Sequence, residues 1–286
     1  MPRVKAGDVS LGWREWGAGD VTVVFLHGNL ASKDWIELAA PLFPSGLRVI
    51  GIDWRGCGDS DRPEPASDYS NYSMQQHAED MLAALDTLDI RFCHLATHST
   101  GGIIAARMLL MQPERFGRVL ALDPVTPLGL AFNADQLGLF RAMIASKQLT
   151  RTVMATAASS LFVPESMTPN AIPRFREGLG EIQALFDRIV EQTFGVSEGI
   201  WIGTPVNLNR EKESRELERR MPEIRHAHLV LWGERDGWIP LPDLRTMAET
   251  MPDCRLVVVP GIGHSMNLEV PALYAGYFGA WFGALQ

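Results

Sequence analysis

Most informative in this chain is the segment Leu95-Ala96-Thr97-His98-Ser99-Thr100-Gly101-Gly102, where an apolar run gives way to a helical pattern. A serine at such a junction sits on a sharp turn with strained backbone angles, so its flanking residues must be small enough for strand and helix to approach. Gly101 meets that need on one side, whereas Thr97 stands where the G-x-S-x-G pattern has glycine. The segment therefore predicts a strand-to-helix turn at Ser99, with a tighter steric fit than glycine would give.

On both sides of this segment, short apolar runs bounded by Gly and Asp alternate with longer helical patterns. That alternation is typical of βαβ units and a mostly parallel sheet. The expected strands are Ser10–Trp16, Val21–Leu26, Arg48–Asp53, Phe92–Thr97, Val119–Leu122, Leu229–Trp232 and Arg255–Val259. The expected helices are Trp35–Leu42, Met74–Leu88, Gly101–Met111, Pro242–Met251 and a terminal amphipathic helix within Val270–Gln286. The pattern predicts an α/β core.

The alternation stops at Pro127 and resumes near Ala227, and the stretch between has helical patterns without a convincing strand. We expect a core domain of residues 1–126 and 211–286, interrupted by a helical insertion of residues 127–210. Most apolar side chains of the insertion should hold its small helices together. Six of them are candidates for lining a substrate pocket: Phe132, Phe140, Met143, Phe162, Phe186 and Trp201.

Three polar residues, Ser99, Asp236 and His264, each follow one of the expected strands. In an open parallel sheet, reactive groups collect at the carboxyl ends of the strands. The turn His27-Gly28-Asn29 follows another strand, and its glycine lets the backbone bend and present an N–H toward the same edge. Serine, acid and histidine also occur in the chain order that one type of hydrolase uses. The joint pattern is far more specific than any of its parts.

The composition of the 286 residues, 46% hydrophobic and 21% charged, is that of an ordinary globular protein. The formal charge is −8, and Lys and Arg form no cluster, which argues against a nucleic-acid partner and disfavours a strongly anionic substrate. The three cysteines are far apart and the histidines lack ligand spacing, so we expect neither a disulfide framework nor a metal site.

No apolar signal segment follows Met1, and the uncharged run Val270–Gln286 is shorter than the roughly 20 residues that a membrane span needs. We therefore expect a cytoplasmic protein without a membrane partner. The sequence does not predict the oligomeric state.

The loop Asp53-Trp54-Arg55-Gly56-Cys57-Gly58-Asp59-Ser60 is similar to a D-x-R-G-x-G-x-S segment common in the α/β-hydrolase superfamily. With the serine turn and the Ser, Asp, His order, this loop makes the chain resemble that superfamily from Leu11 to Leu285, in the branch that has a helical cap after the sixth strand. The resemblance implies a mostly parallel, eight-stranded-type sheet flanked by helices, with residues 127–210 as the cap.

By the same resemblance, Ser99 is the nucleophile, His264 the general base and Asp236 the carboxylate that orients the histidine. The oxyanion hole would use the backbone N–H groups of Asn29 and Thr100. These groups match the needs of acyl transfer, in which a serine hydroxyl loses its proton as it attacks and paired donors stabilise the developing oxyanion.

One alternative for the acid stays open. Asp123, at the end of an earlier strand, occupies the other position from which related enzymes supply the carboxylate. His27 and His98 lie near the expected site, and we expect them to anchor loops.

A serine at position 99 excludes the haloalkane dehalogenases and epoxide hydrolases that the layout also resembles, because those enzymes need a carboxylate there. We expect a cofactor-free serine hydrolase, an esterase or lactonase, acting on a small and partly apolar ester or lactone. The alternatives are a ligand-binding receptor with slow turnover, or a thioesterase, a carbon–carbon bond hydrolase or a cofactor-free oxygenase that uses the same pocket.

Overall fold

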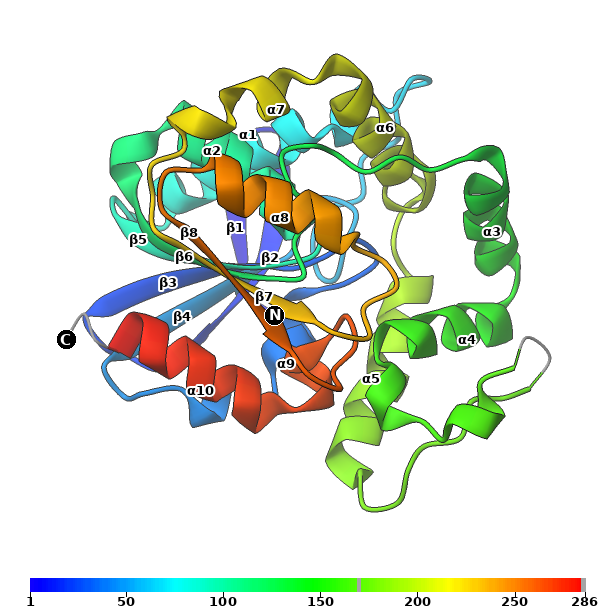
Figure 1. The fold of residues 1–286 in the computed structure, drawn as a ribbon. Coiled ribbons are helices and arrows are strands. Elements are labelled where there is room, and N and C mark those ends of the chain that lie inside the picture. The colour runs from blue at the N-terminus through cyan, green and yellow to red at the C-terminus, as the bar shows by residue number, and fades with distance from the viewer. Residues whose placement is uncertain (169–170, 284–286) are drawn as a thin grey trace.

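The structure, a computed structural model, describes residues 1–168 and 171–283. Within these residues eight strands form one sheet in the order β1-β2-β4-β3-β5-β6-β7-β8. The strands are β1 (Arg3–Ala6), β2 (Val9–Trp16), β3 (Val21–Leu26), β4 (Leu47–Ile52), β5 (Cys93–His98), β6 (Phe116–Leu122), β7 (His228–Gly233) and β8 (Cys254–Val259). The pairs β1–β2 and β2–β4 are antiparallel, and all other neighbours are parallel. The predicted mostly parallel sheet flanked by helices is confirmed (Figure 1).

The strand β1 is missing from the strands predicted by pattern. It has only four residues, and it forms because Arg3 to Ala6 pair with the first part of β2 across a turn at Gly7, where φ is +58°. Glycine adopts this left-handed conformation without strain. The pairing partner defines this strand, since four residues are too few for a reliable alternation pattern.

Helices cover both faces of the sheet. One face carries α1 (Met74–Thr87), α2 (Gly101–Met111) and α8 (Leu241–Thr250), and the other carries α9 (Met266–Glu269) and α10 (Pro271–Phe282) (Figure 1). The expected terminal helix is therefore found as far as Phe282, whereas residues 284–286 lie outside the described part of the chain.

The predicted continuous helix over Trp35–Leu42 is wrong. The structure has two short 3₁₀ segments there, Lys33–Ile36 and Ala40–Leu42. Proline at position 41 contributes to this, because it has no N–H to donate to the carbonyl of Glu37, as a continuous α-helix would require.

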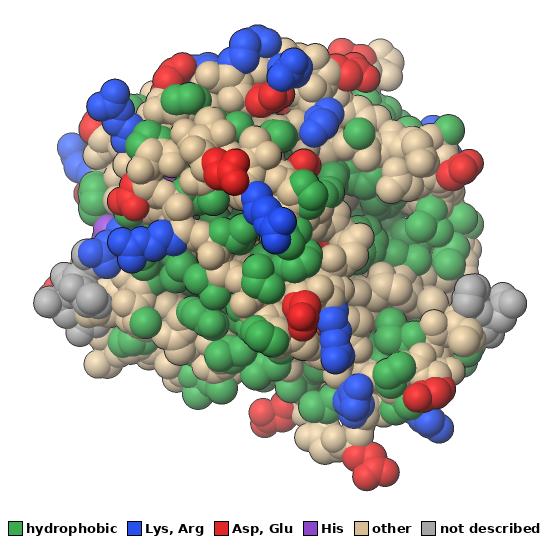
Figure 2. Space-filling view, viewed as in Figure 1, with side chains coloured by type: hydrophobic (Ala, Val, Ile, Leu, Met, Phe, Trp, Pro, Cys, Tyr) green, Lys and Arg blue, Asp and Glu red, His purple; other side chains and the backbone are tan. Residues whose placement is uncertain are grey.

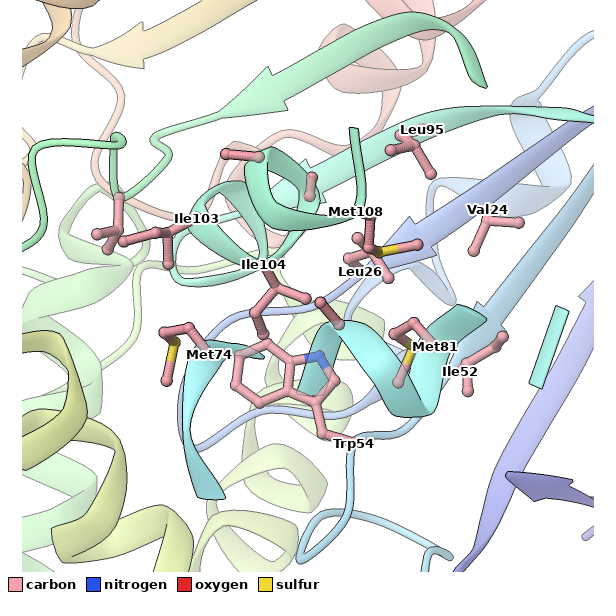
Figure 3. Packing of buried hydrophobic residues seen from close by; sticks show 14 of the residues in the cluster. Val24, Leu26, Ile52, Trp54, Met74, Met81, Leu95, Ile103, Ile104 and Met108 are labelled. Atoms are coloured by element: carbon pink, nitrogen blue, oxygen red, sulfur yellow. The ribbon is translucent and has the colours of Figure 1, made fainter. Parts of the chain in front are cut away.

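The apolar core beneath α1 and α2 follows from the 3.6-residue period of these helices. In Figure 3, side chains of both helices surround Trp54, which is fully buried, and meet side chains from the strands. Those labelled are Met74 and Met81 of α1, Ile103, Ile104 and Met108 of α2, and Val24, Leu26, Ile52 and Leu95 of the sheet. Burying each such side chain is worth about 1.5–3 kcal/mol, so this packing holds α1 and α2 against the sheet.

The chain between β6 and β7 is helical. It contains α3 (Ala134–Ala145), α4 (Lys147–Ala157), α5 (Gly180–Phe194), a π-helical turn (Gly199–Gly203), α6 (Thr204–Ser214) and α7 (Glu216–Arg220). Figure 1 shows α3, α4 and α5 beyond the edge of the sheet at which β7 ends. The expected division at residues 210 and 211 falls inside α6, and it stays a proposal.

A buried ion pair holds the loop after β4. The ammonium group of Lys33 lies 2.7 Å from Asp53 Oδ2 and 2.6 Å from Asp59 Oδ2, and the side chains of Lys33 and Asp53 have no exposed surface. Asp53 also accepts the backbone N–H groups of Lys33 at 2.7 Å and of Asp59 at 2.9 Å. The contact therefore ties the segment after β3 to the loop after β4, in agreement with the sequence motif at residues 53–60.

We predict that Lys33→Ala lowers the free energy of unfolding by about 3–5 kcal/mol, because it leaves the buried Asp53 carboxylate without a cation. Denaturant titration followed by circular dichroism measures the change. Lys147→Ala is the matched control, since Lys147 pairs with Glu191 on the surface, where such a pair is worth about 0–1 kcal/mol. Equal losses in the two variants would contradict the prediction.

Candidate active site

The turn between β5 and α2 holds Ser99 in a left-handed conformation, with φ of +52°. Its backbone N–H donates to the carbonyl of Leu122 at 3.0 Å, and its own carbonyl accepts from Gly102 and Val125, both at 2.9 Å. Such a strained residue persists only where its surroundings hold it, and strained residues are concentrated at functional sites.

Small residues around the turn make this conformation possible. A Cβ atom on Gly101 would lie 2.3 Å from the carbonyl oxygen of Leu26, and one on Gly28 would lie 2.9 Å from Cβ of Ser99. Thr97, which replaces the expected glycine, is fully buried and lines a small cavity together with Gly102 and Ala105. The β-branched residue is therefore accommodated because its neighbours are small.

A histidine and a carboxylate meet beside this turn. His264, in the loop after β8, donates from Nδ1 to Oδ2 of Asp236 at 2.8 Å. Asp236 lies in the loop after β7, and its Oδ1 accepts the N–H groups of Trp238 at 2.6 Å and Ile239 at 3.3 Å. Burial raises the pKa of Asp236, but the contact with His264 and the two N–H groups outweigh it and leave that pKa below its ordinary value.

The second acidic candidate, Asp123, lies next to this pair. It follows β6 with φ of +43°, is fully buried, and accepts the N–H of Gly233 at 2.8 Å through Oδ1. One carboxyl oxygen of Asp123, one of Asp236 and one ring nitrogen of His264 all lie within 4.8 Å of one another. The structure thus brings both candidate carboxylates to the histidine, and Asp236 is the one that accepts the hydrogen bond from its imidazole.

His98 contacts the loop that carries His264. Its Nε2–H donates to the backbone carbonyl of His264 at 2.9 Å. Burial lowers the pKa of His98 to about 3, so its ring is neutral and the proton stays on Nε2 for this bond. This contact agrees with the expected role of His98 as a loop anchor.

Sequence reasoning missed Glu269, a buried residue of α9 that organises the same loop. Its Oε2 accepts the N–H of Gly263 at 3.1 Å and its Oε1 accepts that of Ser265 at 3.0 Å, on either side of His264. Oε2 also accepts the N–H of Ser160 at 3.0 Å, which belongs to the helical insertion. One carboxylate therefore joins the histidine loop to the insertion. The sequence gives no signal for the contact with the insertion, because Ser160 and Glu269 are 109 positions apart.

Ser99 and His264 line a common pocket with about 630 Å³ of empty space, part of it open to solvent. Asn29 and Thr100, the expected oxyanion-hole residues, also line it. Among the described residues, Ser99 Oγ forms no hydrogen bond with His264, and the N–H groups of Asn29 and Thr100 have no acceptor. These two N–H groups, in the pocket that Ser99 lines, are therefore available to donate to a bound molecule.

Three of the six expected lining residues, Phe132, Phe140 and Met143, line this pocket. The other three do not. Phe162 and Phe186 pack with Phe175 in an aromatic cluster, with ring centroids 4.4–5.4 Å apart, and Trp201 lines a separate surface hollow. The sequence did not predict the remaining apolar lining, which is Leu30, Trp35, Val125, Leu130, Met154, Ala157, Leu208, Trp238 and Ile239.

Charged side chains of both signs are interspersed on the face shown in Figure 2, so this face presents no large patch of a single sign within the described residues. The helices of the described residues are all too short or too polar to cross a membrane. The cytoplasmic location remains a prediction.

Comparison with known proteins agrees with the fold. A family model described as "alpha/beta hydrolase fold" matches residues 21–271, and the chain therefore belongs to this family. The solved structure of Est816, described as an N-acyl homoserine lactone degrading enzyme, superposes with a TM-score of 0.74 at 23% identity. It covers 98% of this chain and all of that one, and a likeness at this identity concerns the fold alone.

Two curated relatives show how varied the similar proteins are. A dihydrolipoyllysine-residue acetyltransferase component of an acetoin cleaving system from Pseudomonas putida is 25% identical over 269 residues, which are 93% of this chain and 65% of that protein. A non-heme chloroperoxidase from Streptomyces lividans is 32% identical over 146 residues, or 48% and 51% of the two chains. The chain thus spans less than two thirds of the length of these relatives. Others are named as dehalogenases and as 2-hydroxy-6-oxononadienedioate hydrolases. The names of these relatives cover several reactions, so membership of the family leaves the reaction and the substrate of this chain open.

We predict that Glu269→Gln lowers both stability and turnover, because an amide has only one acceptor oxygen for three N–H groups, and leaving a buried donor unpaired costs about 1–3 kcal/mol. Thermal denaturation and steady-state kinetics measure the two effects. Glu249→Gln, on the exposed side of α8, is the matched control and should change neither. A Glu269→Gln protein as stable as this control would contradict the proposed link.

Proposed function

We propose that the chain is a serine hydrolase that cleaves a carboxylic ester or lactone of a small, partly apolar substrate through an acyl-enzyme. One observation carries the proposal. A single pocket contains Ser99, held at φ +52° between β5 and α2, and His264, whose imidazole is hydrogen-bonded to the buried carboxylate of Asp236.

In the first step His264 acts as the general base. Its Nδ1 is engaged by Asp236, which leaves Nε2 as the basic nitrogen. The Nε2 atom takes the proton of Ser99 as Oγ attacks the carbonyl carbon, and then returns that proton to the leaving alkoxide. A water molecule, deprotonated by the same nitrogen, then attacks the acyl-serine and releases the acid. A substrate in the pocket is expected to bring Oγ and Nε2 together, since such contacts often tighten only in the substrate complex.

The unused N–H groups of Asn29 and Thr100 support an oxyanion hole on the pocket wall beside Ser99. Two donors aimed at the carbonyl oxygen stabilise the negative charge that develops during attack, and removing one costs roughly 3–4 kcal/mol of barrier. Because both donors belong to the backbone, they are fixed before the substrate binds.

Asp236, rather than Asp123, is assigned as the carboxylate that orients His264. The hydrogen bond to Nδ1 at 2.8 Å supports this choice, as does the lowered pKa of Asp236, which keeps this carboxylate charged at neutral pH. A charged partner stabilises the imidazolium that forms in the transition state.

The pocket lining supports an uncharged substrate. Apart from His98 and His264, its residues have no titratable side chain, and residues of the proposed cap, 127–210, supply Leu130, Phe132, Phe140, Met143, Met154, Ala157 and Leu208. An apolar acyl or ring portion would be buried there. Serine in place of a carboxylate at position 99 disfavours the alkyl-ester chemistry of dehalogenases.

We predict that Ser99→Ala abolishes both hydrolysis of p-nitrophenyl butyrate and covalent labelling by a fluorophosphonate. In another hydrolase that has a Ser-His-Asp triad, loss of the serine nucleophile lowers kcat by about 10⁶-fold. Mass spectrometry locates the label, and multiple-turnover kinetics separates an enzyme from a receptor with slow turnover. Ser45→Ala, at an exposed loop position, is the control and should retain both properties. Undiminished turnover in Ser99→Ala would contradict the proposed acyl-enzyme mechanism.

We further predict that kcat/KM for p-nitrophenyl butyrate exceeds that for mono-p-nitrophenyl succinate by about 100-fold or more, because the pocket offers no cation to a buried carboxylate. The two acyl chains have the same number of carbon atoms. In Met143→Lys the preference should shrink or reverse, whereas Met143→Leu should keep it. Equal kcat/KM values for the two esters in the unaltered protein would contradict the uncharged-substrate assignment.

A further inference from the structure

Two buried carboxyl groups lie side by side at the carboxyl edge of the sheet. Asp123 follows β6 and Asp236 follows β7, and both side chains have no exposed surface. One carboxyl oxygen of each lies within 4.8 Å of one carboxyl oxygen of the other and of a ring nitrogen of His264. The proposed mechanism uses only one of these carboxylates.

Two adjacent buried carboxylates cannot both be ionised without a compensating cation. The charged or titratable groups that face Asp123 are Asp236, His264 and, from α9, Glu269. Among the described residues no lysine or arginine forms a salt bridge with Asp123 or Asp236. A proton bound by the carboxyl pair would reduce this negative charge without a lysine or arginine.

The hydrogen bonds indicate which carboxyl group holds the proton. Asp236 accepts from His264 and from two backbone N–H groups, an environment that favours the charged form. Asp123 accepts only the N–H of Gly233 through Oδ1, while its buried Oδ2 has no donor in the described residues. An unpaired buried oxygen is rare, and protonation turns it into a donor.

We propose that Asp123 is a carboxylic acid at neutral pH whose Oδ2–H donates to Asp236, and that it thereby acts as a positioning residue for the carboxylate that orients His264. This inference rests on the proposed function, in which Asp236 has that role. The left-handed backbone of Asp123 and the Gly233 contact fix Oδ1. Rotation of the carboxyl group is thus restrained, and the group lies within hydrogen-bonding reach of Asp236.

The electrostatics agree with this geometry. Burial, the charge of Asp236 and a hydrogen bond to Asp236 raise the pKa of Asp123 well above its ordinary value, and they outweigh the N–H of Gly233. Because the folded-state pKa lies above the unfolded one, the contribution of Asp123 to stability is fully present below the unfolded pKa of about 3.9 and is lost as the pH rises through the folded pKa. Ionised Asp123 would also repel Asp236 and Glu269.

The decisive variant is Asp123→Asn. Its side-chain oxygen can accept from Gly233 while its NH₂ donates to Asp236, so the amide imitates the protonated acid at every pH. We expect Asp123→Ala to lower kcat/KM at pH 7 by about 10- to 100-fold, since it leaves Gly233 N–H and one side of Asp236 unpaired. We expect Asp123→Asn to restore most of that loss and to keep its activity to higher pH than the unaltered protein.

Two further measurements need no turnover. The infrared difference spectrum at pH 7 between the unaltered protein and Asp123→Asn should contain the C=O band of a protonated carboxylic acid. The melting temperature should fall less steeply from pH 6 to pH 9 in Asp123→Asn than in the unaltered protein. The exposed Asp253→Asn is the matched control and should show neither difference.

Absence of the carboxylic acid band, with parallel melting curves, would overturn the proposal even if Ser99 is labelled. If Asp236→Asn kept full activity while Asp123→Asn lost it, Asp123 would be the orienting acid and the assignment of the proton would be wrong. Loss of stability on treatment with EDTA and its recovery with Zn²⁺ would also overturn it, since the cluster would then hold a metal ion. Failure of Ser99 labelling bears on the proposed function alone.

Discussion

The register of the parallel strands is the constraint on which the site depends. His98 of β5 pairs with Leu122 of β6, and Leu122 pairs with Leu231 of β7. Ser99 and Asp123 therefore stand at the same level, one residue beyond this pair, and the backbone N–H of Ser99 donates to Leu122. A shift of one residue in this pairing would turn every side chain to the other face of the sheet. The loops after β7 and β8 then bring their polar residues to the same edge.

Buried charge follows a consistent pattern in this protein. Lys33 is paired with Asp53, Arg55 donates to Asp80 at 2.6 and 2.7 Å, and Glu269 accepts three backbone N–H groups. Each buried ion therefore has a partner that offsets the cost of removing it from water. Asp123 differs from these groups, because one of its oxygens has no hydrogen-bond donor in the described residues. The proposed proton would remove its negative charge and let this oxygen donate a hydrogen bond.

The helical insertion has two functions in the proposed enzyme. Its side chains supply much of the apolar pocket wall, and its Ser160 N–H shares the Glu269 carboxylate with the loop that carries His264. Pocket and catalytic loop are thus joined through one residue. In this arrangement the pocket wall and the strand ends that carry the reacting groups belong to different parts of the chain, which is how one fold can serve different substrates.

The sequence by itself determined the features that local pattern encodes: the alternation of strands and helices, the tight turn at Ser99, and the order of serine, aspartate and histidine after successive strands. Only the tertiary structure decided what depends on partners far along the chain. It created β1 by pairing with β2, and it placed Phe132 in the pocket but Phe162 in an aromatic cluster. It also set Asp123 beside Asp236, 113 positions away. Periodicity specifies that a side chain is apolar or polar, whereas its direction and its neighbours are fixed only when the elements pack.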